Sequence, residues 1–252
     1  MTFDVAAEAY GRFMGRFAEP LAGPFADRAG VAPGMRALDV GCGPGALTAE
    51  LVRRLGPAAV AAIDPSPPFV AAARERFGEA DVREGVAERL PFSDGSFDVV
   101  LAQLVVHFMA DPVAGLAEMR RVAQPGGREA ACVWDHGGDG GPLSAFWRAA
   151  RDLDPHAPDE SNMAGVREGH LVELSEAAGL TDIQPSTLVI RVEFASFDQW
   201  WEPFLLGVGP VGAYLGRLDP PRLAALRDHC EAVMPAGPFT VEASAWCVVG
   251  RA

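Results

Sequence analysis

The chain has 252 residues, of which 49% are hydrophobic, a size that supports one well-buried domain with insertions or two small domains. Its formal net charge is −13, which argues against partners with dense negative charge, both nucleic acid and an anionic membrane surface. All 21 basic residues are arginine, so the sequence excludes a pyridoxal Schiff base, a Walker-type phosphate lysine and a lysine general base.

Four cysteines are present: Cys42, Cys132, Cys230 and Cys247. They have neither the spacing of a metal site nor that of a disulfide framework, so we expect buried free thiols and no bound metal. The sequence also contains no signal peptide and no apolar run of membrane length, which predicts a cytoplasmic protein.

Apolar runs alternate with amphipathic segments between residues 36 and 135. Strands are expected at 37–40, 60–63, 81–83, 97–104 and 130–134, with helices between them. The helix over 112–123 should end at the breaker Gln124-Pro125-Gly126-Gly127. Short loops between alternating strands and helices predict right-handed crossovers and an open α/β sheet.

The pattern changes after residue 135. A helix over 168–178 should end at Gly179, and alternating apolar and polar residues predict strands at 188–194 and 241–249. We interpret segments 136–167 and 195–238 as insertions over the sheet. Their aromatic residues either line a pocket or form plain core: Phe146, Trp147, Trp200, Trp201 and Phe204.

A glycine-rich turn follows the first strand, in Leu38-Asp39-Val40-Gly41-Cys42-Gly43-Pro44-Gly45, and Asp64 closes the next strand. Glycines let a backbone approach a ligand closely, and an acid at the end of the second strand is placed to hold a ribose by its hydroxyls. This pattern predicts a site for an adenosine cofactor. Gly41, Gly43 and Ala46 also fit the dinucleotide fingerprint, so the turn alone leaves the cofactor open.

Two further segments bear on the cofactor: Leu90-Pro91-Phe92-Ser93-Asp94-Gly95-Ser96-Phe97-Asp98-Val99-Val100, and the breaker at 124–127. Together with the glycine turn they resemble class I S-adenosylmethionine-dependent methyltransferases over residues 36–135, and they are similar to the ubiquinone and menaquinone biosynthesis group. The resemblance implies one methyltransferase domain over 1–252 with a Rossmann-like α/β fold. Its seven-stranded, mostly parallel sheet would have an antiparallel last strand, with helical lid segments at 1–30, 136–167 and 195–238.

The resemblance also implies that S-adenosylmethionine is the cofactor. Gly41 and Gly43 would pass beneath its methionine part, with Asp39 organising the turn or approaching the amino group. Asp64 would take both ribose hydroxyls. The other implied contacts are Pro65, Ala87 and Glu88 around the adenine, Gln103 near the methionine amino group, and Tyr10 and Arg16 in an N-terminal segment folded over the cofactor.

Several of these assignments have structural alternatives. Asp64 could cap the following helix, Glu88 could be a solvated loop charge, and Gln103 could be a polar group at a sheet end. Arg16 could be a surface charge on an amphipathic helix. Val86 stands where the family has an aspartate, which puts one contact to the adenine amino group in doubt.

Two histidines follow strands at the sheet edge where ligands of open α/β folds bind. His107 follows the fourth strand and matches the first histidine of the family's "LHH" segment, with Phe108 in place of the second, and His136 follows the fifth strand. Histidine is suited to removing a proton from a hydroxyl or amine acceptor near neutral pH. In the alternative reading both histidines are structural, and alignment of the acceptor with the activated methyl group suffices.

The expected function is methyl transfer from S-adenosylmethionine to a small, partly apolar or aromatic metabolite, with oxygen favoured over nitrogen or carbon. Two alternatives stay open: a cofactor-binding protein without transfer activity, and a nicotinamide-dependent oxidoreductase. The expected partner is a small-molecule acceptor, without nucleic acid or stable membrane association. The sequence determines neither the acceptor nor the oligomeric state.

Overall fold

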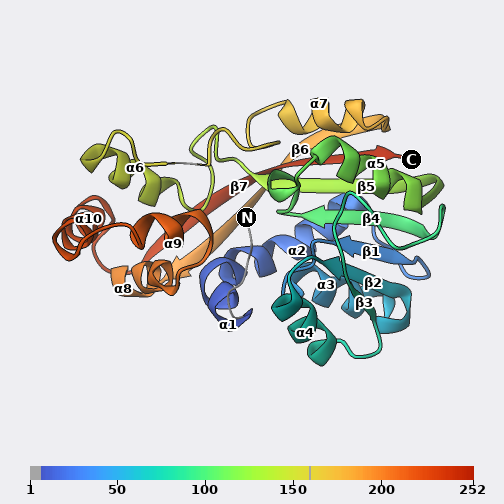
Figure 1. The fold of residues 1–252 in the computed structure, drawn as a ribbon, viewed down its shortest axis with the longest axis horizontal. Coiled ribbons are helices and arrows are strands. Elements are labelled where there is room, and N and C mark those ends of the chain that lie inside the picture. Colours follow the sequence, from blue (N-terminus) through green and yellow to red (C-terminus); the bar gives the residue numbers. More distant parts are fainter. Residues whose placement is uncertain (1–6, 159) are drawn as a thin grey trace.

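The computed structural model describes residues 7–158 and 160–252 and is built around a seven-stranded sheet (Figure 1). The strand order is β3-β2-β1-β4-β5-β7-β6. The strands are β1 (Ala37–Val40), β2 (Val60–Asp64), β3 (Asp81–Glu84), β4 (Phe97–Gln103), β5 (Ala123–Trp134), β6 (Thr181–Phe194) and β7 (Phe239–Arg251). Strands β1 to β5 pair in parallel, and β7 lies antiparallel between β5 and β6, which confirms the predicted fold class.

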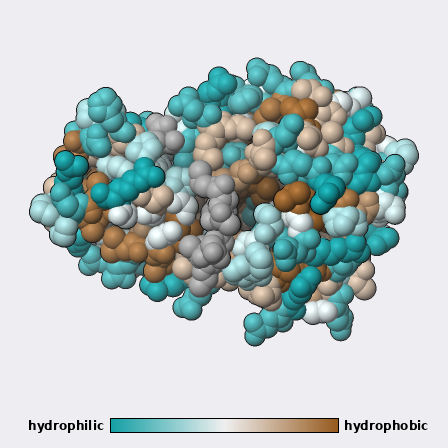
Figure 2. Space-filling view, viewed as in Figure 1, coloured by the Kyte–Doolittle hydropathy of each residue, from teal (hydrophilic) through white to brown (hydrophobic). Residues whose placement is uncertain are grey.

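Helices cover both faces of this sheet. The α-helices of the described residues are α1 (Ala7–Tyr10), α2 (Arg16–Ala29), α3 (Ala46–Leu55), α4 (Pro67–Arg76), α5 (Pro112–Val122), α6 (Ser144–Leu153), α7 (His170–Ala177), α8 (Phe197–Trp201), α9 (Gly209–Leu215) and α10 (Pro220–Val233). Helices α2 and α3 contribute to the core on one face, and α5 and α7 to the core on the other. Among the helices described, none has the length and apolar character needed to cross a bilayer. Hydrophilic residues cover most of the face seen in Figure 2.

Helix ends follow local sequence chemistry. Asp111 and Asp219 precede α5 and α10, and their carboxylates accept backbone N–H groups of the first turn, from Ala114 at 3.0 Å and Arg222 at 2.9 Å. These bonds satisfy donors that a helix start leaves without partners. Gly179, which follows α7, has a φ of +85°, the left-handed conformation expected of a glycine at that place.

Strands β5 and β6 each begin seven residues before their predicted starts at 130 and 188. Strand β5 starts at Ala123, so the predicted breaker at 124–127 lies inside it. The register with β4 shifts there, from Phe97–Ala123 to Val99–Arg128, and the extra residues form an irregular stretch. Strand β6 starts at Thr181 instead of 188 because β7 continues far enough to pair with it. Its Pro185 is tolerated because β6 is an edge strand.

The long β6–β7 pair extends beyond the rest of the sheet, and α8, α9 and α10 lie between these strands in the chain (Figure 1). The five aromatic residues of the insertions are buried there and pack on one another. The rings of Phe146 and Phe204 lie 5.0 Å apart, and those of Trp200 and Phe204 lie 4.7 Å apart. The aromatic set is therefore the core of the insertions.

Candidate functional site: two adjoining cavities

The turn between β1 and α3 is held in shape by backbone contacts. The N–H groups of Gly41 and Cys42 both donate to the carbonyl of Ile63 in β2, at 2.7 and 3.0 Å. Gly41 and Gly43 have φ values of +72° and +55°, a region that favours glycine. A Cβ on Gly41 would collide with Val105, whereas a Cβ on Gly43 would meet no atom of the described residues within 4 Å. The turn thus leaves open space directly above Gly43.

Asp39 lies beneath this turn. Its Oδ2 accepts the hydroxyl of Thr48 in α3 at 2.6 Å, while Oδ1 is buried and has no hydrogen-bond partner among the described residues. Burial raises the pKa of the Asp39 carboxyl to about 7, and the negative charge of Asp64 adds to the effect. Two roles were predicted for Asp39, organising the turn and approaching the methionine amino group, and its contacts fit the first.

A cavity of about 640 Å³ opens at the carboxyl ends of β1, β2 and β4. Its wall includes six of the ten predicted cofactor residues: Tyr10, Gly41, Gly43, Asp64, Pro65 and Gln103. Five further wall residues were not predicted: Ser66, Phe69, Leu104, Val105 and Phe108. Phe69 packs edge-on against the ring of Tyr10, with centroids 5.2 Å apart. The two rings give this cavity an aromatic side.

The carboxylate of Asp64 is 6% exposed and accepts two backbone N–H groups, from Gly43 to Oδ2 and from Ser66 to Oδ1, each at 2.8 Å. Burial raises its pKa, and the two hydrogen bonds act in the opposite direction. Two carboxylate oxygens offer about four acceptor sites, so capacity remains for a pair of ligand hydroxyls. Asp64 therefore holds the turn and keeps further acceptor capacity for a ligand in the cavity.

Gln103 ends β4 and is 7% exposed. Its Nε2 donates to the carbonyl of Ala18 in α2 at 2.9 Å, which fixes the orientation of the amide. The remaining oxygen, Oε1, is buried and accepts no hydrogen bond from any residue the structure describes. A buried acceptor without a donor is costly, and a ligand ammonium group in this cavity would supply the missing donor.

The structure places the other three predicted cofactor residues outside the cavity wall. Arg16 donates from Nη1 to the carbonyl of Gln199 at 2.9 Å and lies over the ring of Phe194, 5.1 Å from its centroid. Glu88 accepts the backbone N–H groups of residues 110 and 111, at 2.7 and 3.2 Å, before α5. Ala87 is buried in the core beneath α5. In this arrangement Arg16 joins α2 to β6 and α8, and Glu88 holds the turn before α5.

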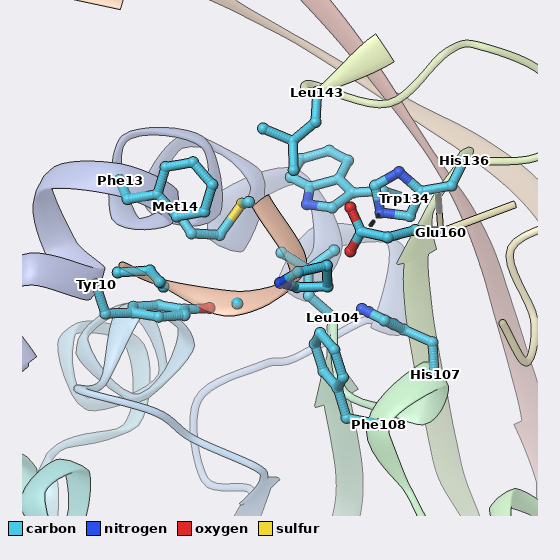
Figure 3. A pocket seen from close by; sticks show the side chains of 13 residues that line it. Tyr10, Phe13, Met14, Leu104, His107, Phe108, Trp134, His136, Leu143 and Glu160 are labelled. Atoms are coloured by element: carbon cyan, nitrogen blue, oxygen red, sulfur yellow. Dashed lines mark ion pairs between the residues drawn. The ribbon is translucent and has the colours of Figure 1, made fainter. Parts of the chain in front are cut away.

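A second cavity of about 400 Å³ adjoins the first, because Tyr10, Leu104 and Phe108 belong to both walls (Figure 3). Both predicted histidines line it. The rest of its wall consists of Phe13, Met14, Trp134, Leu143, Glu160, Val208, Gly209 and Pro210. The polar side chains of this wall are those of Tyr10, His107, His136 and Glu160, and the last three come from three different segments.

His107 lies in the short turn Val106–Phe108 after β4. Burial lowers the pKa of its imidazole to about 3, and the nearby ring of His136, 6.2 Å away between centroids, contributes in the same direction. The ring is therefore neutral throughout the physiological pH range. Its Nδ1 is buried, without a hydrogen-bond partner in the described part of the chain.

Glu160 is a polar wall residue that the sequence analysis missed. Its Oε2 accepts the indole N–H of Trp147 at 3.0 Å, and its Oε1 lies 3.9 Å from Nε2 of His136. The Glu160 and His136 side chains are only 5% and 4% exposed. The residue lies in the irregular segment between α6 and α7, where no periodicity marks it, so only the folded chain reveals its position.

Comparisons with known proteins agree with this geometry. The family profile described as "Methyltransferase domain" matches residues 38–131. An uncharacterized 37.1 kDa protein in transposon TN4556 of Streptomyces fradiae is 33% identical over 239 residues, which are 87% of this chain and 63% of that protein. A demethylmenaquinone methyltransferase of Beutenbergia cavernae is 40% identical over 102 residues, 40% of this chain and 42% of that enzyme. The chain thus spans less than two thirds of the length of either relative.

A solved structure shows a similar fold over almost the whole chain. It is a SAM-dependent methyltransferase from Thermotoga maritima, titled a possible histamine N-methyltransferase, with a TM-score of 0.58 and 17% identity. The match covers 97% of this chain and 95% of that one. The matched profile, the quinone-biosynthesis relatives and this fold agree with the glycine turn and Asp64: residues 38–131 match the methyltransferase family, and the chain as a whole has the fold of a class I S-adenosylmethionine-dependent methyltransferase.

Proposed function

We propose that the chain transfers the methyl group of S-adenosylmethionine to an oxygen atom of a small, partly apolar or aromatic metabolite. The observation that carries this proposal is the pair of adjoining cavities, which share Tyr10, Leu104 and Phe108. One cavity has polar groups suited to a nucleoside and an amino acid. The other is mostly apolar, with one polar corner. A donor and an acceptor in the two cavities would meet at the shared wall.

The residues of the first cavity fit the cofactor. The carboxylate of Asp64 would accept the ribose hydroxyls, the orphaned Oε1 of Gln103 would accept the methionine ammonium, and the open space above Gly43 would admit the chain between them. Tyr10 and Phe69 offer aromatic faces, which attract a cationic group. The bound cofactor supplies a methyl group already activated by a positively charged sulfur.

The contribution of the protein is then alignment of the acceptor and exclusion of water. Holding two reactants in line can lower the barrier by several kcal/mol without any further catalytic group. Leu143, Glu160 and residues 208–210, which come from the two insertions, line the second cavity and would cover it, and the buried aromatic residues belong to the apolar core that supports them. The segments 1–30, 136–167 and 195–238 would act as this cover, although residues 1–6 and 159 lie outside the described part.

The proposal is tested by binding first and turnover second. Calorimetry should show S-adenosylhomocysteine binding to the purified chain, and the same experiment with NAD should show none. Incubation with labelled S-adenosylmethionine and small aromatic acceptors should then yield S-adenosylhomocysteine and a methylated product. Tight NAD binding would instead favour an oxidoreductase. S-adenosylhomocysteine binding with no methylated product from any acceptor would favour a cofactor-binding protein without transfer.

A further inference from the structure

The polar corner of the second cavity has an unusual spacing. Nε2 of His136 and Oε1 of Glu160 are 3.9 Å apart, too far for a direct hydrogen bond. Figure 3 shows the Glu160 carboxylate directed into the cavity between the rings of His136 and His107. At this distance the carboxylate can still stabilise a positive charge on the imidazole. The corner therefore pairs a histidine with a carboxylate in a cavity whose wall is mostly apolar.

The second oxygen of Glu160 is already occupied. Its bond from the Trp147 indole at 3.0 Å holds the carboxylate in place from the side of α6. A buried carboxylate with a fixed orientation can stabilise a positive charge on the neighbouring imidazole. Among the described residues no carboxylate makes such a contact with His107, whose ring stays neutral, so only His136 is placed to hold a proton.

We propose, building on the methyltransferase function above, that the acceptor is a phenol, that His136 takes its hydroxyl proton, and that Glu160 is the positioning residue for His136. The neutral ring of His107 faces the same cavity and can hydrogen-bond the acceptor without holding the proton. This assigns a proton acceptor, a positioning residue and a substrate class to one corner of the site.

The chemistry favours a phenol over other hydroxyls. A phenol has a pKa of about 10 and an imidazole of about 6.5, so the proton transfer is modestly uphill, whereas an aliphatic hydroxyl is far less acidic. The apolar wall, with Phe13, Trp134 and Phe108, suits an aromatic ring. An ammonium acceptor beside Glu160 would be held in its protonated form, without the lone pair that transfer needs.

The step balances in atoms and charge. The phenol O–H bond breaks and its proton forms a bond to Nε2 of His136, while the oxygen gains a bond to the methyl carbon. The carbon–sulfur bond breaks, and its electron pair stays on sulfur. At the end the ether and the thioether are neutral, and the imidazolium of His136 lies beside the carboxylate of Glu160, so no unpaired charge is left in the apolar cavity.

The test compares acceptors of different acidity. We expect the chain to methylate 4-methylphenol and 4-nitrophenol at pH 8, where the second is largely ionised in water and needs no base. Glu160→Gln should lower kcat for 4-methylphenol by about 10²-fold, and His136→Asn by about 10²- to 10⁴-fold, the range for a general base. Both variants should change kcat for 4-nitrophenol by less than about threefold, since its proton is already lost.

Binding and control measurements accompany the rates. The Kd of 4-methylphenol, measured by calorimetry with S-adenosylhomocysteine present, should change by less than about threefold in Glu160→Gln, because the carboxylate acts through His136. Glu168→Gln makes the same chemical change at an exposed position of the same segment, outside the cavity wall, and should behave as the unaltered chain.

Other outcomes would overturn the inference. Equal losses of kcat on both phenols in Glu160→Gln would show that the residue is structural. Methylation of 4-methylaniline but not of 4-methylphenol, or no methylation of any phenol by a chain that binds S-adenosylhomocysteine, would refute the phenol class and leave the proposed function standing. Absence of S-adenosylhomocysteine binding would refute the proposed function itself.

Discussion

The carboxylate of Asp64 accepts the backbone N–H of Gly43 at 2.8 Å, which ties the end of β2 to the glycine turn after β1. The same carboxylate also accepts the N–H of Ser66 at the start of α4. One side chain therefore fixes three segments around the first cavity. Its loss should affect the shape of the turn and ligand binding together.

Asp64→Asn should weaken S-adenosylhomocysteine binding by about 1–3 kcal/mol, because an amide replaces one of the two acceptor oxygens and loses the charge. Calorimetry at pH 7 measures the change. Asp81→Asn, at the exposed start of β3, is the matched control and should leave the affinity unaltered. Equal affinity of Asp64→Asn and the unaltered chain would mean that the ribose binds elsewhere.

Gly43→Ala should reduce cofactor binding at a small cost in stability. The φ of +55° costs an L-residue about 1–2 kcal/mol, and the new methyl group would occupy space that belongs to the cavity. Thermal unfolding with and without S-adenosylhomocysteine separates the two effects. We expect a slightly lower Tm and a much smaller ligand-induced rise in Tm. A full ligand-induced rise would contradict the placement of the ligand above Gly43.

His107 should make stability depend on pH on the acid side. The folded-state pKa of about 3 lies below the ordinary value of 6.5, so the unfolded chain binds more protons between these values. This contribution to the free energy of unfolding is complete above pH 6.5 and is lost as the pH falls toward 3. His107→Asn should flatten the curve in that window. Denaturant unfolding from pH 4 to 7 measures this dependence. If the free energy of unfolding varied with pH equally in the variant and the unaltered chain, the imidazole of His107 would be hydrated in the folded state.

Glu129 should make the free energy of unfolding fall as the pH rises, the reverse of the dependence expected from His107. It is 1% exposed, both carboxylate oxygens lack partners among the described residues, and burial raises its pKa well above the ordinary value. A raised folded-state pKa gives a contribution that is complete below about pH 4.5 and is lost as the pH rises toward the folded-state value. Glu129→Met should therefore increase the free energy of unfolding at pH 7 by about 1–3 kcal/mol.

The control for this prediction is Glu193→Gln, which alters an exposed glutamate on β6 and should leave unfolding unchanged. A less stable Glu129→Met variant at pH 7 would show that the Glu129 carboxyl has polar contacts in solution.

Sequence predicted the parts of the site that depend on short-range chemistry. The glycine turn and Asp64 could be identified because a tight turn and a strand-end acid leave local signatures. Gln103 was placed correctly at the end of β4, although its bond to Ala18, 85 residues away, carries no sequence signal.

The features that the sequence did not predict depend on contacts between residues far apart in the chain. Arg16 contacts the carbonyl of Gln199, 183 residues further along the chain, and no local pattern could anticipate that partner. Glu160 reaches the second cavity from an irregular segment because Trp147 in α6 holds it there. Strand β6 starts early because its partner β7 is long enough to pair with it. The alternation of apolar and polar residues along β6 does not reveal the length of that partner.

Tyr10 belongs to the walls of both cavities and comes from the first helix that the structure describes. Its ring cannot shift toward one chamber without changing the other. Occupancy of either chamber should therefore alter affinity in its neighbour, and thermodynamic reciprocity requires the two effects to be equal in size. The order in which donor and acceptor bind should then depend on helix α1 as well as on the strand ends that form the cavities.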